Sequence, residues 1–343
     1  MASVRSATSY EVKIGDTTFR QADSDAVESI VLEDHVDMVE ALTVKVAGHE
    51  QAAEWNFEIG MAVEAKLGAG AVLLFKGEVT ALEPSWSVEG MMTMTIRAYD
   101  HTHRLARGRK TRWFNDKTDT DIAQSVGSEC QLDVDADPSG DARAYELQRN
   151  ESNLTFLKRL AARNNFRLAV DEGKLIFKKA DTSSTPTTIT MGSNLRSLRM
   201  SFNSVEQATK VIARGWDIRT KQEIVGIATT GDVETIGGGD LGASTAQTKF
   251  GDAVAYITDV PITSQSQADT LAKSEMNRLA RQYAKGSCTV DGNDALRAGC
   301  VVEFAGLNQP HNGKYYILAS RHIINHTGGY LTEFTFCSNT SGT

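Results

Sequence analysis

Several short stretches of this 343-residue sequence partly match patterns that bind ligands. Residues 237–242 have the glycine spacing of a dinucleotide-binding loop, which works only between a buried strand and a helix that faces the pyrophosphate. Here the glycines are followed by Ala-Ser-Thr-Ala-Gln-Thr-Lys, and no βαβ pattern surrounds them. We therefore expect residues 231–250 to form an exposed loop, and we predict no cofactor site.

Four aspartates between residues 133 and 141 resemble part of a calcium-binding loop. An EF-hand loop needs glycine at its sixth position and a bidentate glutamate at its twelfth. Pro138 and Ala144 stand at those positions. The stretch therefore predicts an acidic surface turn and no metal site.

One dense group of basic residues follows the first hundred residues. Its members, with the histidines and tryptophan among them, are His101, His103, Arg104, Arg107, Arg109, Lys110, Arg112 and Trp113. Cations beside an aromatic ring can follow a nucleic-acid backbone. The net charge of −8 argues against dedicated nucleic-acid binding, so we expect salt bridges between domains or between subunits. Arg104, Arg107 and Arg109 are the candidate interface residues here.

The sequence contains no G-x-S-x-G, no H-E-x-x-H and no P-loop, so we predict no catalytic residues. A pair of carboxylates that cleaves a glycan is defined by its separation in space, which a sequence does not display. A glycan hydrolase with its site in the middle of the chain therefore stays open as an alternative. The four cysteines lack metal-binding spacing and predict buried, reduced thiols.

The pattern of apolar residues divides the chain into β-rich ends and a mixed centre. We expect a β domain over residues 1–99, an α+β domain over 100–180, a linker over 181–188 and a second β domain over 189–343. Alternation of apolar and polar residues, as in Leu42–Val46, predicts strands with one buried face. The sequence contains no run of about 18 apolar residues, which is the length that would predict a membrane span. The N-terminus lacks the apolar core of a signal peptide, so we expect synthesis in the cytoplasm.

Three helices interrupt the strands. Periodic apolar residues and capping residues predict them over Asp119–Glu129, Ser152–Asn164 and Gln265–Ala284. The third carries an apolar stripe that we expect to pack against the second β domain and to form a candidate interface. The residues of this stripe named as interface candidates are Leu271, Met276, Leu279 and Tyr283.

A pattern near residue 60 recurs near residue 299. Each copy has a strand that begins after a glycine, a second strand, a turn and a closing strand of alternating character. The turns are Ser85–Gly90 in the first copy and Asn325–Gly329 in the second. A repeated all-β unit predicts two related barrels or sheets in one chain. Gly90, Gly328 and Gly329 are therefore candidate interface residues at equivalent turns.

Taken in order, these segments resemble the phage late-control gene D family, which includes the baseplate hub of contractile phages and the hub region of VgrG proteins. The segments that carry the resemblance are Tyr99–Arg109, Asn150–Leu157, Ala213–Asp217, Asn312–Tyr316 and Gly329–Phe334. The resemblance implies a mainly β fold with an α+β insertion, in which two related tail-tube-like β-barrel domains flank a small α+β module.

The resemblance also implies a structural, non-enzymatic role. Such hubs are trimers whose six barrels form a pseudo-sixfold ring, which joins the hexameric inner tube to the central spike next to the baseplate wedges. The resemblance implies that the protein is a component of a phage tail or phage-tail-like particle. The spike would then be a separate chain, or the sequence would be truncated before it. A baseplate-associated peptidoglycan hydrolase and a lumenal protein that contacts cargo or DNA remain the alternatives.

Overall fold

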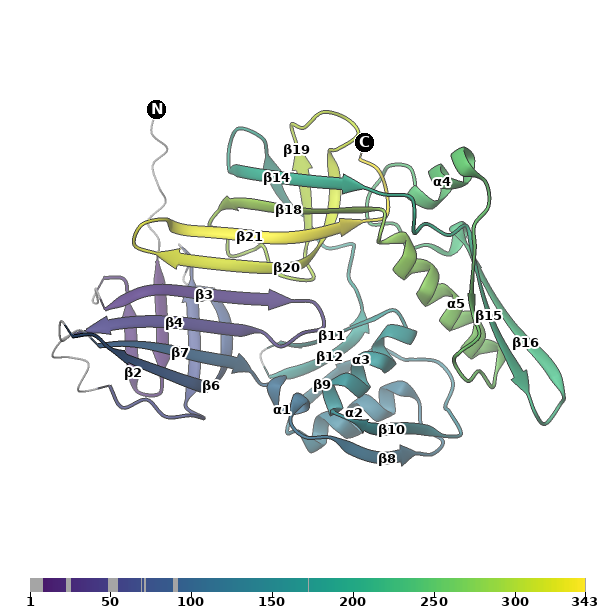
Figure 1. The fold of residues 1–343 in the computed structure, drawn as a ribbon, viewed down its shortest axis with the longest axis horizontal. Helices are drawn as coiled ribbons and strands as arrows, with labels where there is room; N and C mark the ends of the chain where they lie inside the picture. The colour runs from purple at the N-terminus through teal and green to yellow at the C-terminus, as the bar shows by residue number, and fades with distance from the viewer. Residues whose placement is uncertain are drawn as a thin grey trace.

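A computed structural model describes residues 9–22, 26–48, 55–68, 70, 72–88, 92–171 and 173–342. The protein is mainly β, with two curled half-barrel units and α+β insertions (Figure 1). This bears out the predicted fold class. None of the helices in the described ranges is long and apolar enough to span a membrane.

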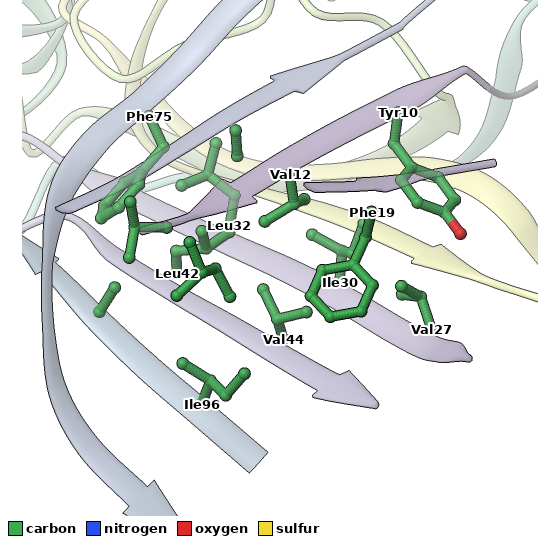
Figure 2. Packing of buried hydrophobic residues seen from close by; sticks show 14 of the residues in the cluster. Tyr10, Val12, Phe19, Val27, Ile30, Leu32, Leu42, Val44, Phe75 and Ile96 are labelled. Atoms are coloured by element: carbon green, nitrogen blue, oxygen red, sulfur yellow. The ribbon is translucent and has the colours of Figure 1, made fainter. Parts of the chain in front are cut away.

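The first β unit contains seven strands that follow one another along the chain. They are β1 (Tyr10–Ile14), β2 (Thr17–Arg20), β3 (Val27–His35), β4 (Ala41–Gly48), β5 (Ala62–Leu67), β6 (Val72–Trp86) and β7 (Met92–Asp100). Every second side chain of β4 is buried, as the sequence pattern predicts. Figure 2 shows Leu42 and Val44 in the same interior as Phe19, Ile30 and Phe75. Burial of this apolar cluster is the main source of stability of the unit.

The second β unit contains six strands from the last part of the chain. They are β13 (Thr187–Thr190), β14 (Leu195–Phe202), β18 (Ala284–Asp291), β19 (Val301–Ala305), β20 (Gly313–Asn325) and β21 (Gly329–Ser338). Phe304, Tyr315 and Phe336 pack ring against ring at its centre, with centroids 5.0 to 5.4 Å apart.

The two β units join edge to edge in one sheet. Residues Ala319–Asn325 of β20 pair antiparallel with Ser29–His35 of β3. The front strands therefore run β14-β18-β21-β20-β3-β4-β7-β6 without interruption, from the top to the bottom of Figure 1. We call the β3–β20 contact the internal seam.

The predicted repeat appears in the backbone hydrogen bonds. Gly60 N donates to Val79 O and Val79 N donates to Met61 O, each over 2.8 Å. In the second unit Gly299 N donates to Ile317 O and Ile317 N donates to Cys300 O, each over 2.9 Å. Gly60 and Gly299 both adopt a φ near +90°, which favours glycine at the start of each copy.

The repeat extends further than the sequence pattern indicated. A bulge between Val79 and Ala81 in the β6–β7 pair corresponds to one between Ile317 and Ala319 in β20–β21. The β3–β4 pair also has a bulge between Val27 and Ser29, and the β14–β18 pair has one at the matching place, between Leu195 and Ser197. Thus β3, β4, β5, β6 and β7 correspond to β14, β18, β19, β20 and β21.

The middle module follows the first β unit. Its elements are α1 (His103–Ala106), β8 (Lys110–Phe114), α2 (Asp119–Glu129), β9 (Asp133–Ala136), β10 (Glu146–Glu151), α3 (Asn153–Arg163), β11 (Phe166–Asp171) and β12 (Lys174–Lys179). Both predicted helices are confirmed. Thr118 and Asp121 form a capping box at the start of α2, and the Ser152 hydroxyl accepts from Thr155 N over 3.1 Å at α3.

Residues 203–283 were expected to be part of the second β domain over 189–343, but their strands do not join its sheet. They form an inserted module of β15 (Lys210–Asp217), β16 (Gln222–Thr229), β17 (Val254–Ile257), a short 3-10 turn, α4 (Gly242–Phe250) and α5 (Gln265–Ala280). The three strands form their own sheet with its own apolar core. The module lies between β14 and β18, at the place of the short β3–β4 turn in the first unit.

Two expectations about this module are wrong. Residues 231–250 were expected to be an exposed loop, yet Gly242–Phe250 forms α4. The apolar stripe of α5 packs against β15 and β16 rather than against the second barrel. The reason is that Gly226 of β16 lacks a side chain, so the sheet of the inserted module accepts Ala268 of α5 closely.

Candidate functional site

The basic group of the sequence lies where the middle module meets the first β unit. Glu78 of β6 is its centre: Arg104 donates to this carboxylate, His103 Nε2 lies 3.1 Å from it and His101 Nε2 lies 3.5 Å from it. Burial alone would raise the pKa of Glu78, but the bonds from Arg104 and His103 outweigh it and lower the pKa. The salt bridging that was predicted for the group is therefore formed within one chain.

Of the remaining basic residues, Arg107, Arg109 and Lys110 are exposed and Arg112 is half-buried. Lys110 Nζ contacts Glu129 over 2.9 Å, and Arg112 donates to the same carboxylate. Arg109 reaches the carbonyl of Asn150 over 3.5 Å, and Arg107 is exposed. Glu129 thus neutralises part of the charge that a nucleic acid would need.

A second charged cluster joins the two β units, and no sequence pattern predicted it. Arg297, before β19, donates to Asp34 over 2.9 Å and to Glu40 over 2.7 Å. A third bond runs from Arg297 to the carbonyl of Leu74 over 2.7 Å. Asp34 and Glu40 are buried, so this junction is a charged contact largely removed from water.

The junction opens on a cavity of about 220 Å³ where the two β units meet the middle module. Its lining includes Asp34, Glu40, Arg297, Arg167 and Asp100. Burial raises the pKa of Asp100 to about 7, against the hydrogen bonds that its carboxylate accepts. A carboxyl beside two others and two arginines could exchange a proton, and His35 and Cys300 also line the cavity.

Two buried acids of the middle module are the nearest approach to a glycosidase pair. Asp119 and Glu146 both accept bonds from Arg163, and Glu146 also accepts from Arg159 over 2.7 Å. A cavity lined by Asp119, Arg143 and Arg163 measures about 20 Å³, which is room for about one water molecule. These carboxylates therefore serve as the centre of an arginine network that holds α2, α3 and β10 together.

The remaining interface candidates from the sequence do not lie together. Met276 belongs to the core of the inserted module and is fully buried, while Leu271 and Leu279 are partly buried and pack against that core. Tyr283 follows α5 and packs on Phe202 of the second β unit, ring centroids 5.6 Å apart.

Two of the three glycine candidates lie at a hairpin turn. Gly328 and Gly329 form the turn between β20 and β21, where Gly329 has a φ of +71°. Gly90 lies outside the described residues. Whether any of these positions contacts another protein stays a prediction.

The ligand patterns of the sequence have no site around them. Asp133 and Asp135 lie in strand β9 rather than in a turn, and Asp135 pairs with Lys178 over 2.6 Å. Across the described ranges no three His, Cys, Asp or Glu residues gather as a metal site. The four cysteines are free, with Cys288 and Cys337 buried. Burial raises the pKa of the Cys288 thiol to about 12, which leaves it unreactive.

A family model described as the Alg8 N-terminal domain matches residues 49–326, most of the chain. The chain belongs to this family. The family description names a domain and states no reaction. No curated protein sequence matches this family member.

Solved structures share the fold of this Alg8_N family member over nearly its whole length. A 43 kDa tail protein of prophage MuSo2 from Shewanella oneidensis has a TM-score of 0.73 at 16% identity, covering 96% of this chain and 98% of that one. The tail protein of Neisseria meningitidis MC58 has a TM-score of 0.72 at 12% identity, covering 97% of each chain.

A third similar structure is an Escherichia coli protein, c3393, described as a component of the type VI secretion system with structural similarity to T4 tail proteins gp27 and gp5. Its TM-score is 0.63 at 12% identity, with 95% of this chain and 76% of that one covered. At such identities these matches establish a shared fold.

Proposed function

We propose that the chain is a structural hub of the baseplate of a contractile phage tail or of a related phage-tail-like injection machine. In this role it is a trimer that joins a hexameric inner tube to a central spike and contacts the baseplate wedge. The resemblance to the late-control gene D and VgrG hub family supports the proposal, together with a fold shared with phage tail proteins.

One observation carries the proposal. The chain contains two β units with the same strand order, the same glycine hydrogen bonds and the same bulges. Three copies of a chain with two similar units supply six similar units, which matches a sixfold tube to a threefold spike. A single catalytic domain has no need of such duplication.

The proposed domain organisation follows the same reasoning. Residues 1–99 and 189–343 would form the ring, the latter interrupted by the inserted module at 203–283. Residues 100–180 would brace the ring from outside, linked by residues 181–188. Assembly in the bacterial cytoplasm and incorporation in a tail particle complete the proposal.

Two arrangements of charged residues weigh against the alternative functions. The buried acids Asp119 and Glu146 are held by arginines, and the cavity that Asp119 lines is too small for a sugar ring. Glu78 and Glu129 occupy several of the cations that would contact DNA or cargo. Incubation with peptidoglycan, followed by chromatography of released fragments, would overturn the non-enzymatic assignment if fragments appeared.

The docking role is tested at the β20–β21 turn. Inserting Gly-Ser-Gly after Thr327 lengthens an exposed hairpin tip, and we expect a soluble protein that no longer binds rings of the cognate tube protein. The same insertion within the 181–188 linker is the matched control and should leave tube binding intact. Equal tube binding by both variants, measured by co-sedimentation, would refute docking through the turn.

A further inference from the structure

Two strand edges lie at opposite ends of the continuous sheet. At one end, residues Ala81–Trp86 of β6 pair with β7 on one side, and no described strand pairs with their other side. At the opposite end, β14 pairs with β18 alone among the strands that the structure describes. In Figure 1 β14 is the top strand of the front sheet, and the β6–β7 hairpin is at its bottom.

The internal seam shows how these two kinds of edge fit together. β6 corresponds to β20 because the bulges after Val79 and Ile317 match. β14 corresponds to β3 because the bulge before Ser197 in the β14–β18 pair matches the bulge before Ser29 in the β3–β4 pair. In the internal seam β20 and β3 are already paired. Every chain therefore contains an equivalent of β20, which is β6, and an equivalent of β3, which is β14. These two strands lie at edges of the sheet that do not meet each other within the chain.

We propose that β6 of one copy pairs antiparallel with β14 of a second copy, in the register of the internal seam. The inference rests on the proposed hub function and specifies the contact that would build its ring. Transferring the seam register places Leu82 opposite Phe202, Pro84 opposite Met200 and Trp86 opposite Leu198. It also places Glu83 opposite Ser201 and Ser85 opposite Arg199.

The side chains match this register on the face that would be covered. The corresponding six residues of the internal seam are all buried: Ile30, Leu32, Asp34, Ser320, His322 and Ile324. At the six equivalent positions of the proposed contact every residue is apolar: Leu82, Pro84, Trp86, Leu198, Met200 and Phe202. Trp86 is 71% exposed in the single chain, and the pairing would cover it.

The opposite face matches as well. In the internal seam Arg321 pairs with Glu33 across the strands over 3.2 Å. The equivalent positions hold Glu83 and Ser201, and Arg199 lies diagonally opposite Glu83, within reach of an ion pair. A slip of one residue would bring Trp86 to the polar face and Arg199 to the apolar one, so the pattern selects one register.

Pro84 limits promiscuous pairing at this edge. Proline donates no backbone hydrogen bond and is typical of edge strands that avoid chance partners. Specificity must then come from the side-chain match, which favours β14 of another copy over an unrelated strand. Because the contact is heterologous, its repetition closes a ring of three chains or continues as a filament.

Disulfide mapping of the full-length chain tests the register. Ser85→Cys and Arg199→Cys are combined in one chain, since directly opposite residues have Cα atoms close enough for a disulfide. After mild oxidation we expect the non-reducing gel band to shift from one chain to three linked chains. Val31→Cys with Ile323→Cys, the equivalent pair of the internal seam, is the positive control and should oxidise within a single chain.

The mismatch control is Ser85→Cys with Ser201→Cys, which are opposite only in a register slipped by two residues. Trimers in native mass spectra without a Ser85–Arg199 cross-link would overturn the proposed edges and leave the hub function standing. A protein that stays monomeric and uncross-linked would overturn both. A ladder beyond three chains would confirm the edges and contradict ring closure.

Discussion

Arg297 joins the two β units through Asp34 and Glu40, and replacing it with methionine measures how strongly this junction holds the internal seam. Methionine keeps much of the aliphatic volume but removes the charge and all three donated bonds. Asp34, which is 8% exposed, and Glu40, which is 7% exposed, would then lose the charge that Arg297 supplies to them. We therefore expect the seam to open more often.

The structure sets the size of this effect. Removing one partner of a buried ion pair typically costs about 3–5 kcal/mol, and the low end applies because the Arg297 side chain is 25% exposed. A loss of about 3 kcal/mol corresponds to roughly a hundredfold change in an opening equilibrium.

Hydrogen exchange followed by mass spectrometry measures the opening of the internal seam directly. Peptides from β3 and β20 should exchange roughly a hundredfold faster in Arg297→Met, while peptides from α3 in the middle module should not change. Arg321→Met is the matched control: its contacts with Glu33 and Glu333 are exposed at the surface of the same seam. Its expected cost is below about 1 kcal/mol.

Equal exchange rates in the two variants would refute the reasoning. Such a result would mean that the buried pairs at Arg297 stabilise the seam no more than a surface pair does. Asp34→Asn combined with Arg297→Met provides a further check, because removing one stranded charge should recover part of the lost protection.

Three further predictions concern single positions. The pKa of Asp100 is raised to about 7 in the folded chain, so as the pH rises the unfolded chain loses this proton at a lower pH than the folded chain does. The free energy of unfolding should therefore fall between about pH 4 and 7. Asp100→Asn should flatten that fall in thermal melts, and an unchanged pH profile would contradict the prediction. A Cβ atom at Gly226 would lie 2.2 Å from the backbone carbonyl carbon of Ala268, so Gly226→Val should displace α5 and lower the helical circular dichroism signal. Gly231→Ala is the control and should leave the signal unchanged, because its Cβ would lie 3.7 Å from the nearest atom, in Thr229. Leu279→Asp places a charge in the core of the inserted module and should cost several kcal/mol there; normal protection of α5 in hydrogen exchange would show that the residue is not packed as described.

Local signals in the sequence predicted the middle module well. The caps at Thr118 and Ser152 and the apolar stripes of α2 and α3 act within a few residues, so a single sequence displays them. The helix α4 was missed because its Gly, Ser and Thr content is typical of loops. Its first residue, Gly242, lies against the ring of Tyr283, a tertiary contact that outweighs local propensity.

Long-range features were predicted only in part. The repeat was visible where glycines with positive φ mark it, at Gly60 and Gly299. The correspondence of β3 with β14 was not visible, because a short turn follows one strand and the whole inserted module follows the other. The Arg297 junction was missed for a similar reason, since Asp34 and Glu40 lie more than 250 residues away in sequence.

Native mass spectrometry of the full-length chain, at micromolar concentration and physiological salt, tests the central claim most directly. A ring of six similar β units built from chains with two units each predicts a complex of three chains. A stable monomer or dimer under these conditions would contradict the account of the chain as a ring-forming hub.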